Sequence, residues 1–156
     1  MPIRDATPDY AIGPLLQRAH RHAADAFNSA LTALDIQGRH FGVLMTLQRL
    51  GPMNQTRLVE HLGADKSAMV RMIDDLESRG FVKRCDDPAD RRAVAVTLTE
   101  SGTKAFKQAE TIAKAAADDL LEGFDAAERA QFKRLLGKFV NVAPSDVAPL
   151  PGRGQQ

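Results

Sequence analysis

The chain has a single cysteine, no excess of either charge and no long apolar run, and each of these absences removes a class of protein. One cysteine among 156 residues cannot form an internal disulfide and fits a reducing cytosol. The first residues, MPIRDATPDY, lack the apolar run of a signal peptide, and no segment reaches the roughly 20 apolar residues of a membrane span. The sequence therefore predicts a cytoplasmic protein without a membrane segment.

The positive and negative charges nearly cancel, so the net charge neither supports nor excludes binding to nucleic acid. Lysine and arginine total 21, and aspartate and glutamate total 20, so the bulk charge does not steer the chain toward DNA. Any basic surface must come from the arrangement of a few residues. The length suits one domain with helical extensions, and no internal repeat is visible.

The beginning of the chain carries two amphipathic helical patterns. The first helix is expected to begin at an N-cap, Asp9, and its apolar residues form two adjacent stripes. Gly38 is expected to lie in the break before a second helix at residues 40–50, which the pair Gly51-Pro52 ends. A helix that is apolar on two stripes requires two partners, and its small alanines permit close helix approach.

The end of the chain is helical as well. Thr99 is expected to cap a long helix at residues 100–122, and Asp125 and Glu128 have the spacing of a capping box before the last helix. These terminal helices are longer than a small core needs. They can belong to the core of a monomer, but their length favours pairing with a second chain.

The central segment has the pattern of a helix-turn-helix followed by a hairpin. Asn54 is expected to cap a helix ending at Leu62, Gly63 allows a left-handed turn, and Asp65 caps a second helix that reaches about Arg79. In this second helix four apolar residues spaced i, i+3, i+4, i+7 are predicted to face the core, namely Met69, Met72, Ile73 and Leu76. Two strands, at 81–84 and 93–98, are predicted to flank the loop DDPADRR and to form a wing.

We therefore predict a mainly α fold with a small β-hairpin wing, in which a winged helix-turn-helix is flanked by N- and C-terminal dimerisation helices. The expected regions are a disordered N-terminus at 1–8, an N-terminal dimerisation helix at 9–37, a winged helix-turn-helix DNA-binding region at 38–99, C-terminal dimerisation helices at 100–142 and a disordered tail at 143–156.

These segments together resemble one family, the MarR-type (multiple antibiotic resistance regulator) transcription factors. The matching motifs are Gly51-Pro52, Asn54-Gln55, Leu62-Gly63, Asp65-Lys66-Ser67, Leu76-Glu77-Ser78-Arg79-Gly80, Asp87-Pro88-Ala89-Asp90-Arg91-Arg92 and Leu98-Thr99-Glu100-Ser101-Gly102. The resemblance extends from the first helix to about Val140. It implies a homodimeric repressor that binds double-stranded DNA at an inverted repeat, with half-sites roughly 10 bp apart, and that a small aromatic or phenolic ligand releases.

The resemblance also assigns DNA contacts. The residues expected at base edges in the major groove are Ser67, Ala68, Val70 and Arg71. Those expected at phosphates are Gln55 and Lys66, at helix starts. In the wing, Arg92 is expected to enter the minor groove with its guanidinium held by Asp90, and its neighbour Arg91 is expected to contact the DNA as well. A solvated residue or a phosphate contact is the alternative for Arg71, and a surface ion-pair cluster is the alternative for the wing trio.

Two positions depart from the family pattern. Arg57 occupies a place where many relatives have a capping Glu, and a cation near a helix N-terminus is unfavourable unless it meets a phosphate. We therefore include Arg57 among the expected DNA contacts, although it can also simply be tolerated there. Asp75 stands where relatives often carry a basic residue, and it is expected either to weaken DNA binding or to pair with Arg79 at i+4.

The ligand site and the rival functions are less well defined by the sequence. Candidate ligand-lining residues are His20, Phe27, His40, Phe41, Met45 and Phe106, and each of them fits an ordinary core position better. Neither a cofactor nor a metal site is expected, because the histidines form no ligand cluster. An enzyme using Cys85 is disfavoured because no histidine or oxyanion motif accompanies it. The remaining alternative is a winged-helix protein-interaction module without DNA binding, against which Arg71, Asp90 and Arg92 argue.

Overall fold

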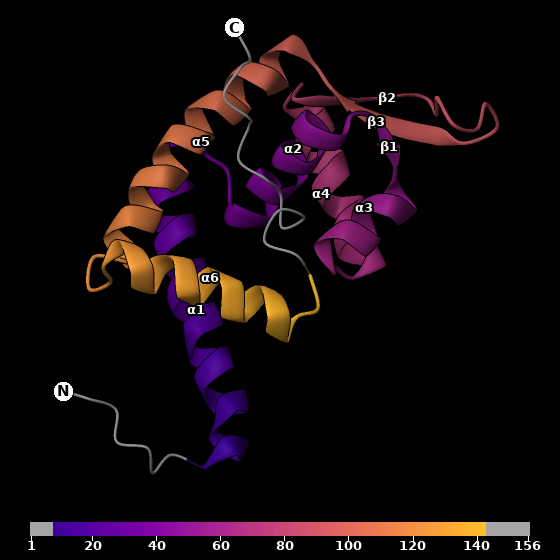
Figure 1. Cartoon of the computed structure of the whole chain (residues 1–156). Helices are drawn as coiled ribbons and strands as arrows, with labels where there is room; N and C mark the ends of the chain where they lie inside the picture. The colour runs from indigo at the N-terminus through magenta and orange to yellow at the C-terminus, as the bar shows by residue number, and fades with distance from the viewer. Residues whose placement is uncertain (1–7, 143–156) are drawn as a thin grey trace, which may run out of the picture.

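Helices dominate residues 8–142, which are the residues that the computed structural model describes (Figure 1). The elements are α1 (Ile12–Leu31), α2 (Gly38–Leu50), β1 (Met53–Asn54), α3 (Gln55–Leu62), α4 (Lys66–Ser78), β2 (Val82–Asp86), β3 (Val94–Leu98), α5 (Glu100–Leu120) and α6 (Ala126–Phe139). Short 3-10 turns, η1 (Asp9–Ala11) and η2 (Thr32–Leu34), flank α1. None of the helices in this range is long and apolar enough to cross a membrane. Residues 1–7 and 143–156, in the termini predicted to be disordered, lie outside the described range.

The predicted helix-turn-helix is confirmed in α3 and α4. The Asn54 side chain accepts a hydrogen bond from Arg57 N at 3.0 Å, and that of Asp65 accepts one from Ala68 N at 2.9 Å, so both predicted N-caps are formed. Gly63 takes the left-handed conformation between the helices, with φ of 60°. The four apolar residues of α4 are buried as predicted, in one core with side chains from α2, α3, the sheet and α5.

The sheet has three antiparallel strands in the order β1-β3-β2. The predicted hairpin is confirmed as β2 and β3, and the figure shows it extending away from the helices (Figure 1). Its first strand begins at Val82 instead of Phe81, because Phe81 N donates to Leu76 O at 2.9 Å and thereby closes the end of α4. The two-residue strand β1, which pairs Met53 with Val96, was not predicted.

Two predictions near the N-terminus are wrong. Asp9 is not the N-cap of α1, because it begins the separate turn η1 and α1 starts at Ile12 without a side-chain cap. Gly38 is not in the break but is the first residue of α2, where its N–H donates to Asn28 Oδ1 at 2.7 Å. The chain reverses earlier, at Asp35, which has a left-handed φ of 54°.

The junction between the winged module and α5 depends on Thr99 and Gly102. Thr99 caps α5 as predicted, since its Oγ1 accepts from Gly102 N at 2.9 Å. The same hydroxyl donates to Gly80 O at 2.6 Å and thus ties α5 to the end of α4. A Cβ atom on Gly102 would lie 1.8 Å from Phe81 O, so only glycine allows this close approach. From this junction α5 runs alongside α1, and α6 follows the predicted capping box of Asp125 and Glu128 (Figure 1).

Candidate nucleic-acid interface

The exposed face of α4 carries the residues predicted to read bases. Lys66, Ser67, Val70 and Arg71 are exposed and Ala68 is half-buried, whereas Met69 on the opposite face has no exposed surface. Burial of one face therefore aims the other toward solvent, as a helix in the major groove requires. Val70 remains 38% exposed although it is apolar, which suits contact with a thymine methyl group. The base contacts themselves stay predictions.

Asn54 and Asp87 connect the start of α3 to the wing. While Asn54 Oδ1 caps α3, its Nδ2 donates to Asp87 Oδ2 at 3.2 Å. Asp87 is only 4% exposed, and its Oδ1 accepts from Ala89 N at 2.8 Å. This side chain therefore fixes the base of the wing loop relative to the helix-turn-helix. Sequence reasoning placed Asp87 in a family motif but assigned it no role.

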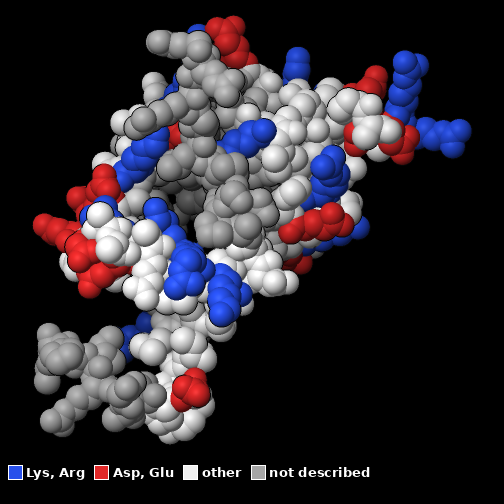
Figure 2. Space-filling view, in the orientation of Figure 1, with Lys and Arg blue, Asp and Glu red and all other residues white. Residues whose placement is uncertain are grey.

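The wing loop presents Asp90, Arg91 and Arg92 to solvent. Figure 2 shows basic side chains projecting from the far end of the hairpin. Asp90 Oδ1 accepts from the backbone N of Arg92 at 3.0 Å, which closes a turn, and no ion pair between the two side chains is present within residues 8–142. The expectation that Asp90 holds the Arg92 guanidinium is therefore wrong in this structure: the carboxylate shapes the loop, and the guanidinium stays available.

Arg84 joins the wing to the recognition helix. From β2 its guanidinium pairs with Asp74 Oδ1 at 2.6 Å and also with the Glu77 carboxylate, both on α4. These pairs offset one of the two negative charges on this side of α4 and fix α4 against the hairpin. The sequence contained no signal for this contact, because the partners lie ten and seven residues apart and on different elements.

Asp75 joins α4 to α2. Its Oδ2 lies 3.1 Å from Arg79 Nε, so the predicted i+4 pair is confirmed, and 3.1 Å from Nε2 of His40. Arg79 in turn reaches Asp35 Oδ2 at 2.9 Å, in the turn between α1 and α2. Burial lowers the pKa of His40 below its usual value, and the charges of Arg39 and Arg79 act in the same direction against that of Asp75.

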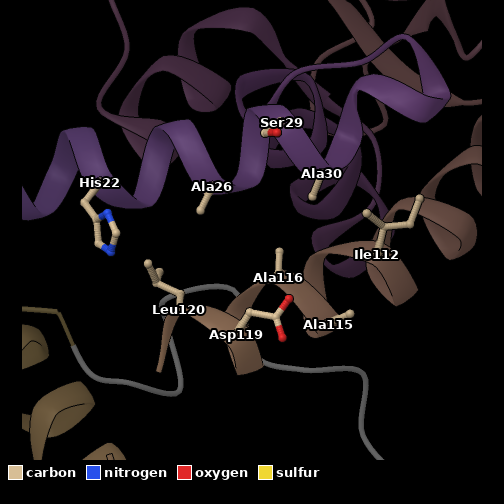
Figure 3. Close-up of a pocket in the computed structure, with 9 residues that line it drawn as sticks. All are labelled: His22, Ala26, Ser29, Ala30, Ile112, Ala115, Ala116, Asp119 and Leu120. Carbon is tan, nitrogen blue, oxygen red and sulfur yellow. The ribbon is translucent and has the colours of Figure 1, made fainter. Parts of the chain in front are cut away.

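The residues predicted to line a ligand pocket do not form one group. Phe41 and Phe106 stack with ring centroids 5.7 Å apart, and Met45 packs against the same core. His20 is instead exposed on α1, and Phe27 is half-buried there. A separate hollow, which sequence reasoning missed, opens between α1 and α5 (Figure 3). Its lining residues are His22, Ala26, Ser29, Ala30, Ile112, Ala115, Ala116, Asp119 and Leu120.

A recognition helix with a buried inner face, a preceding capped helix and a hairpin tied to both define a winged helix-turn-helix protein. Comparison with known proteins narrows the class. A family model described as "MarR family" matches residues 38–94. Over these residues the chain matches the MarR family, and the resemblance found in its sequence is confirmed.

The relatives cover most of this chain. The transcriptional repressor NicR of Pseudomonas putida is 27% identical over 130 residues, which are 83% of this chain and 82% of NicR. A mutant MarR from E. coli, solved in complex with operator DNA, matches with a TM-score of 0.76 and 27% identity over 86% of this chain and 99% of that one. BpsR of Bordetella bronchiseptica, solved to explain regulation of its DNA binding by 6-hydroxynicotinic acid, matches with a TM-score of 0.75 and 28% identity over 83% and 98% of the two chains.

Proposed function

We propose that this chain is a sequence-specific DNA-binding repressor of transcription, acting in the cytoplasm and without enzymatic activity. The observation that carries the proposal is the exposed face of α4 together with an exposed wing arginine, Arg92, which has no ion-pair partner among residues 8–142. Arg71 can donate two hydrogen bonds to a guanine edge, while Arg92 can enter the adjacent minor groove. The relatives support this function, since NicR is a repressor and MarR was solved on operator DNA.

The remaining DNA contacts follow from the same placement. Gln55 and Arg57 lie in the first turn of α3, and Lys66 begins α4, where backbone N–H groups also face outward. These positions suit phosphate contacts that set the register of α4 in the groove. Arg91 is exposed next to Arg92 and supplies a second cation at the end of the wing.

The functional unit is a homodimer. Large apolar side chains remain exposed on the terminal helices, among them Ile12 and Leu15 on α1 and Leu135 and Phe139 on α6. Isolated exposed apolar residues are ordinary, but a set on α1 and α6, together with an open hollow between α1 and α5, indicates a covering partner. A two-fold dimer presents two α4 helices to an inverted repeat with half-sites about 10 bp apart.

A small ligand regulates the dimer. The relative BpsR supports this proposal, because its DNA binding is regulated by 6-hydroxynicotinic acid. The stacked rings of Phe41 and Phe106 lie where α2 meets α5, between the winged module and the terminal helices. An aromatic acid inserted at this junction would change the separation of the two α4 helices and thereby release the DNA.

The test is a gel-shift titration against DNA that flanks the chain's own gene, with random DNA as competitor. We expect a discrete shift that survives an excess of competitor, with an affinity roughly 10³-fold or more above that for random DNA. The same assay then screens aromatic acids for release. Equal affinity for flanking and random DNA across all fragments would contradict sequence-specific binding.

A further inference from the structure

A hollow beside Arg71 opens between the first turn of α2 and the outer side of α4. Arg39, from α2, and Arg71, from α4, both line it, and we call it the two-arginine hollow. Its other polar lining residues are Gln37, His40, Asp75 and Arg79. Arg71 thus belongs both to this hollow and to the face of α4 that is predicted to read bases.

The carboxylate of Asp75, which lines the hollow, already has two partners. Asp75 Oδ2 lies 3.1 Å from both Arg79 Nε and His40 Nε2. Arg79 is further paired with Asp35 at 2.9 Å. Arg39 and Arg71 are exposed, and neither has an ion-pair partner among residues 8–142. Three arginines therefore line the hollow with a single carboxylate, and two of the three have no ion-pair partner among the described residues.

His40 does not change this balance. Its Nδ1 accepts a hydrogen bond from Gln37 N at 3.1 Å, so the Nε2 that faces Asp75 carries the proton of a neutral imidazole. The neutral imidazole of His40 therefore offers no negative charge to Arg39. Arg39 also lies in the first turn of α2, where a cation is unfavourable because of the helix dipole. A bound anion could form ion pairs with the guanidinium groups of both Arg39 and Arg71.

We propose that the two-arginine hollow binds a phosphate group of the DNA backbone, next to the groove that α4 reads. This inference rests on the proposed function, because the phosphate arrives only when α4 enters the major groove. Arginine suits the task, since its planar donors match phosphate oxygens. The hollow extends the DNA contacts to α2, outside the helix-turn-helix and wing, and makes Arg71 a residue shared between base and backbone.

The first experiment measures the salt dependence of operator affinity for wild type, Arg39→Gln and Arg39→Lys. Loss of one phosphate contact per protomer, which is two per operator-bound dimer, should flatten the slope of log K against log salt by about 1.8. The affinity advantage of wild type over Arg39→Gln should then shrink about 12-fold between about 50 and about 200 mM salt. Arg39→Lys should keep most of the slope. The matched control is Lys107→Gln, an exposed cation on α5, which should leave the slope unchanged.

The second experiment locates the phosphate. Operators with single neutral methylphosphonates are scanned against wild type and Arg39→Gln. One position per half-site should weaken wild type but have no effect on Arg39→Gln.

An unchanged salt slope in Arg39→Gln, with normal wild-type binding, would overturn the phosphate site and leave the proposed function intact. Loss of release by aromatic acids in Arg39→Gln, with an unchanged slope, would assign the hollow to a carboxylate ligand and overturn the proposal. Wild-type protein without specific binding would instead contradict the proposed function.

Discussion

At the residue scale, Arg71 and Arg92 project from different elements, and their substitutions should weaken DNA binding in different ways. Arg71→Ala should relax discrimination at one base position in each half-site by about 1–3 kcal/mol, because a bidentate guanine contact is lost. Arg92→Ala should weaken specific and random DNA alike and reduce the salt slope of the dimer by about 1.8, one contact per wing, because its wing contact carries charge more than sequence.

Both effects can be measured by fluorescence anisotropy with a panel of half-site variants at several salt concentrations. Lys107→Gln again serves as the control for a general loss of positive charge. Equal weakening on every half-site variant would contradict base reading by Arg71. A selective loss on the operator alone would contradict the backbone role of Arg92.

His40 gives the fold a pH dependence whose sign follows from its burial. Burial is the largest cause that lowers the pKa of His40, and Arg39 and Arg79 add to it while Asp75 and Asp35 oppose it. Below about pH 6.5 the unfolded chain therefore binds more protons at this residue than the folded chain. The free energy of unfolding is therefore unaffected by His40 well above this pH, and it decreases as the pH falls below it.

The measurement is urea unfolding of wild type and His40→Gln at pH values from about 7.5 to about 5.5. Glutamine can still donate to Asp75 but does not titrate, so the variant should lose less stability over this range. His20, His22 and His61 are common to both proteins and cancel in the difference. Parallel pH profiles would show that His40 does not titrate differently in the two states.

At the scale of elements, the joint between α4, β2 and α5 has no room for a side chain at Gly102. Gly102→Ala should lower the free energy of unfolding by about 1–3 kcal/mol, because the new Cβ would overlap Phe81 O and force the backbone apart. The control is Gly13→Ala in α1, where nothing lies within 4 Å and alanine should be neutral or stabilising by about 0.5–1 kcal/mol. Thermal unfolding monitored by circular dichroism measures both. Equal melting temperatures for Gly102→Ala and wild type would contradict the close approach.

The sequence predicted those elements whose signals are local. Asn54, Asp65 and Thr99 each cap a helix that starts at the next residue, so residue type and apolar spacing were sufficient. The strand β1 was not predictable in this way, because two residues are too short for a pattern and its partner is Val96. The start of α2 was misplaced because its capping box uses Gln37 and His40 instead of the usual residue types.

The candidate site shows the same difference between features set by local sequence and features set by distant partners. The exposed face of α4 followed from helical period, since burial of Met69 and its neighbours decides what remains outside. The roles of Arg84 and Asp87 depend on partners from other elements, which no spacing rule connects. The aromatic candidates illustrate the limit: Phe41 and Phe106 meet across helices, while His20 lies apart on α1.

At the scale of the whole molecule, α6 provides a test of the dimer. Leu135 is 46% exposed and apolar, so Leu135→Glu should place a charge in the proposed interface and shift the protein from dimer to monomer. Operator affinity should fall at least about 10-fold, since one α4 helix reads only half of an inverted repeat.

The oligomeric state is measured by light scattering after gel filtration, and the fold by circular dichroism. Ala130→Glu is the control, because it adds the same charge to α6 on a different side from Leu135. A Leu135→Glu protein that remains dimeric and binds the operator normally would exclude this face from the interface.

The continuity of α5 sets how far a small disturbance travels. Its 21 residues begin at the Gly102 joint of the winged module and end beside α1, and they span about 31 Å at about 1.5 Å per residue. As a lever arm of that length, α5 turned by about 6° at one end moves the other by about 3 Å, close to the roughly 3.4 Å between successive base pairs. A rotation too slight to disturb the packing of either module is therefore enough to shift each recognition helix by about one base pair against the DNA.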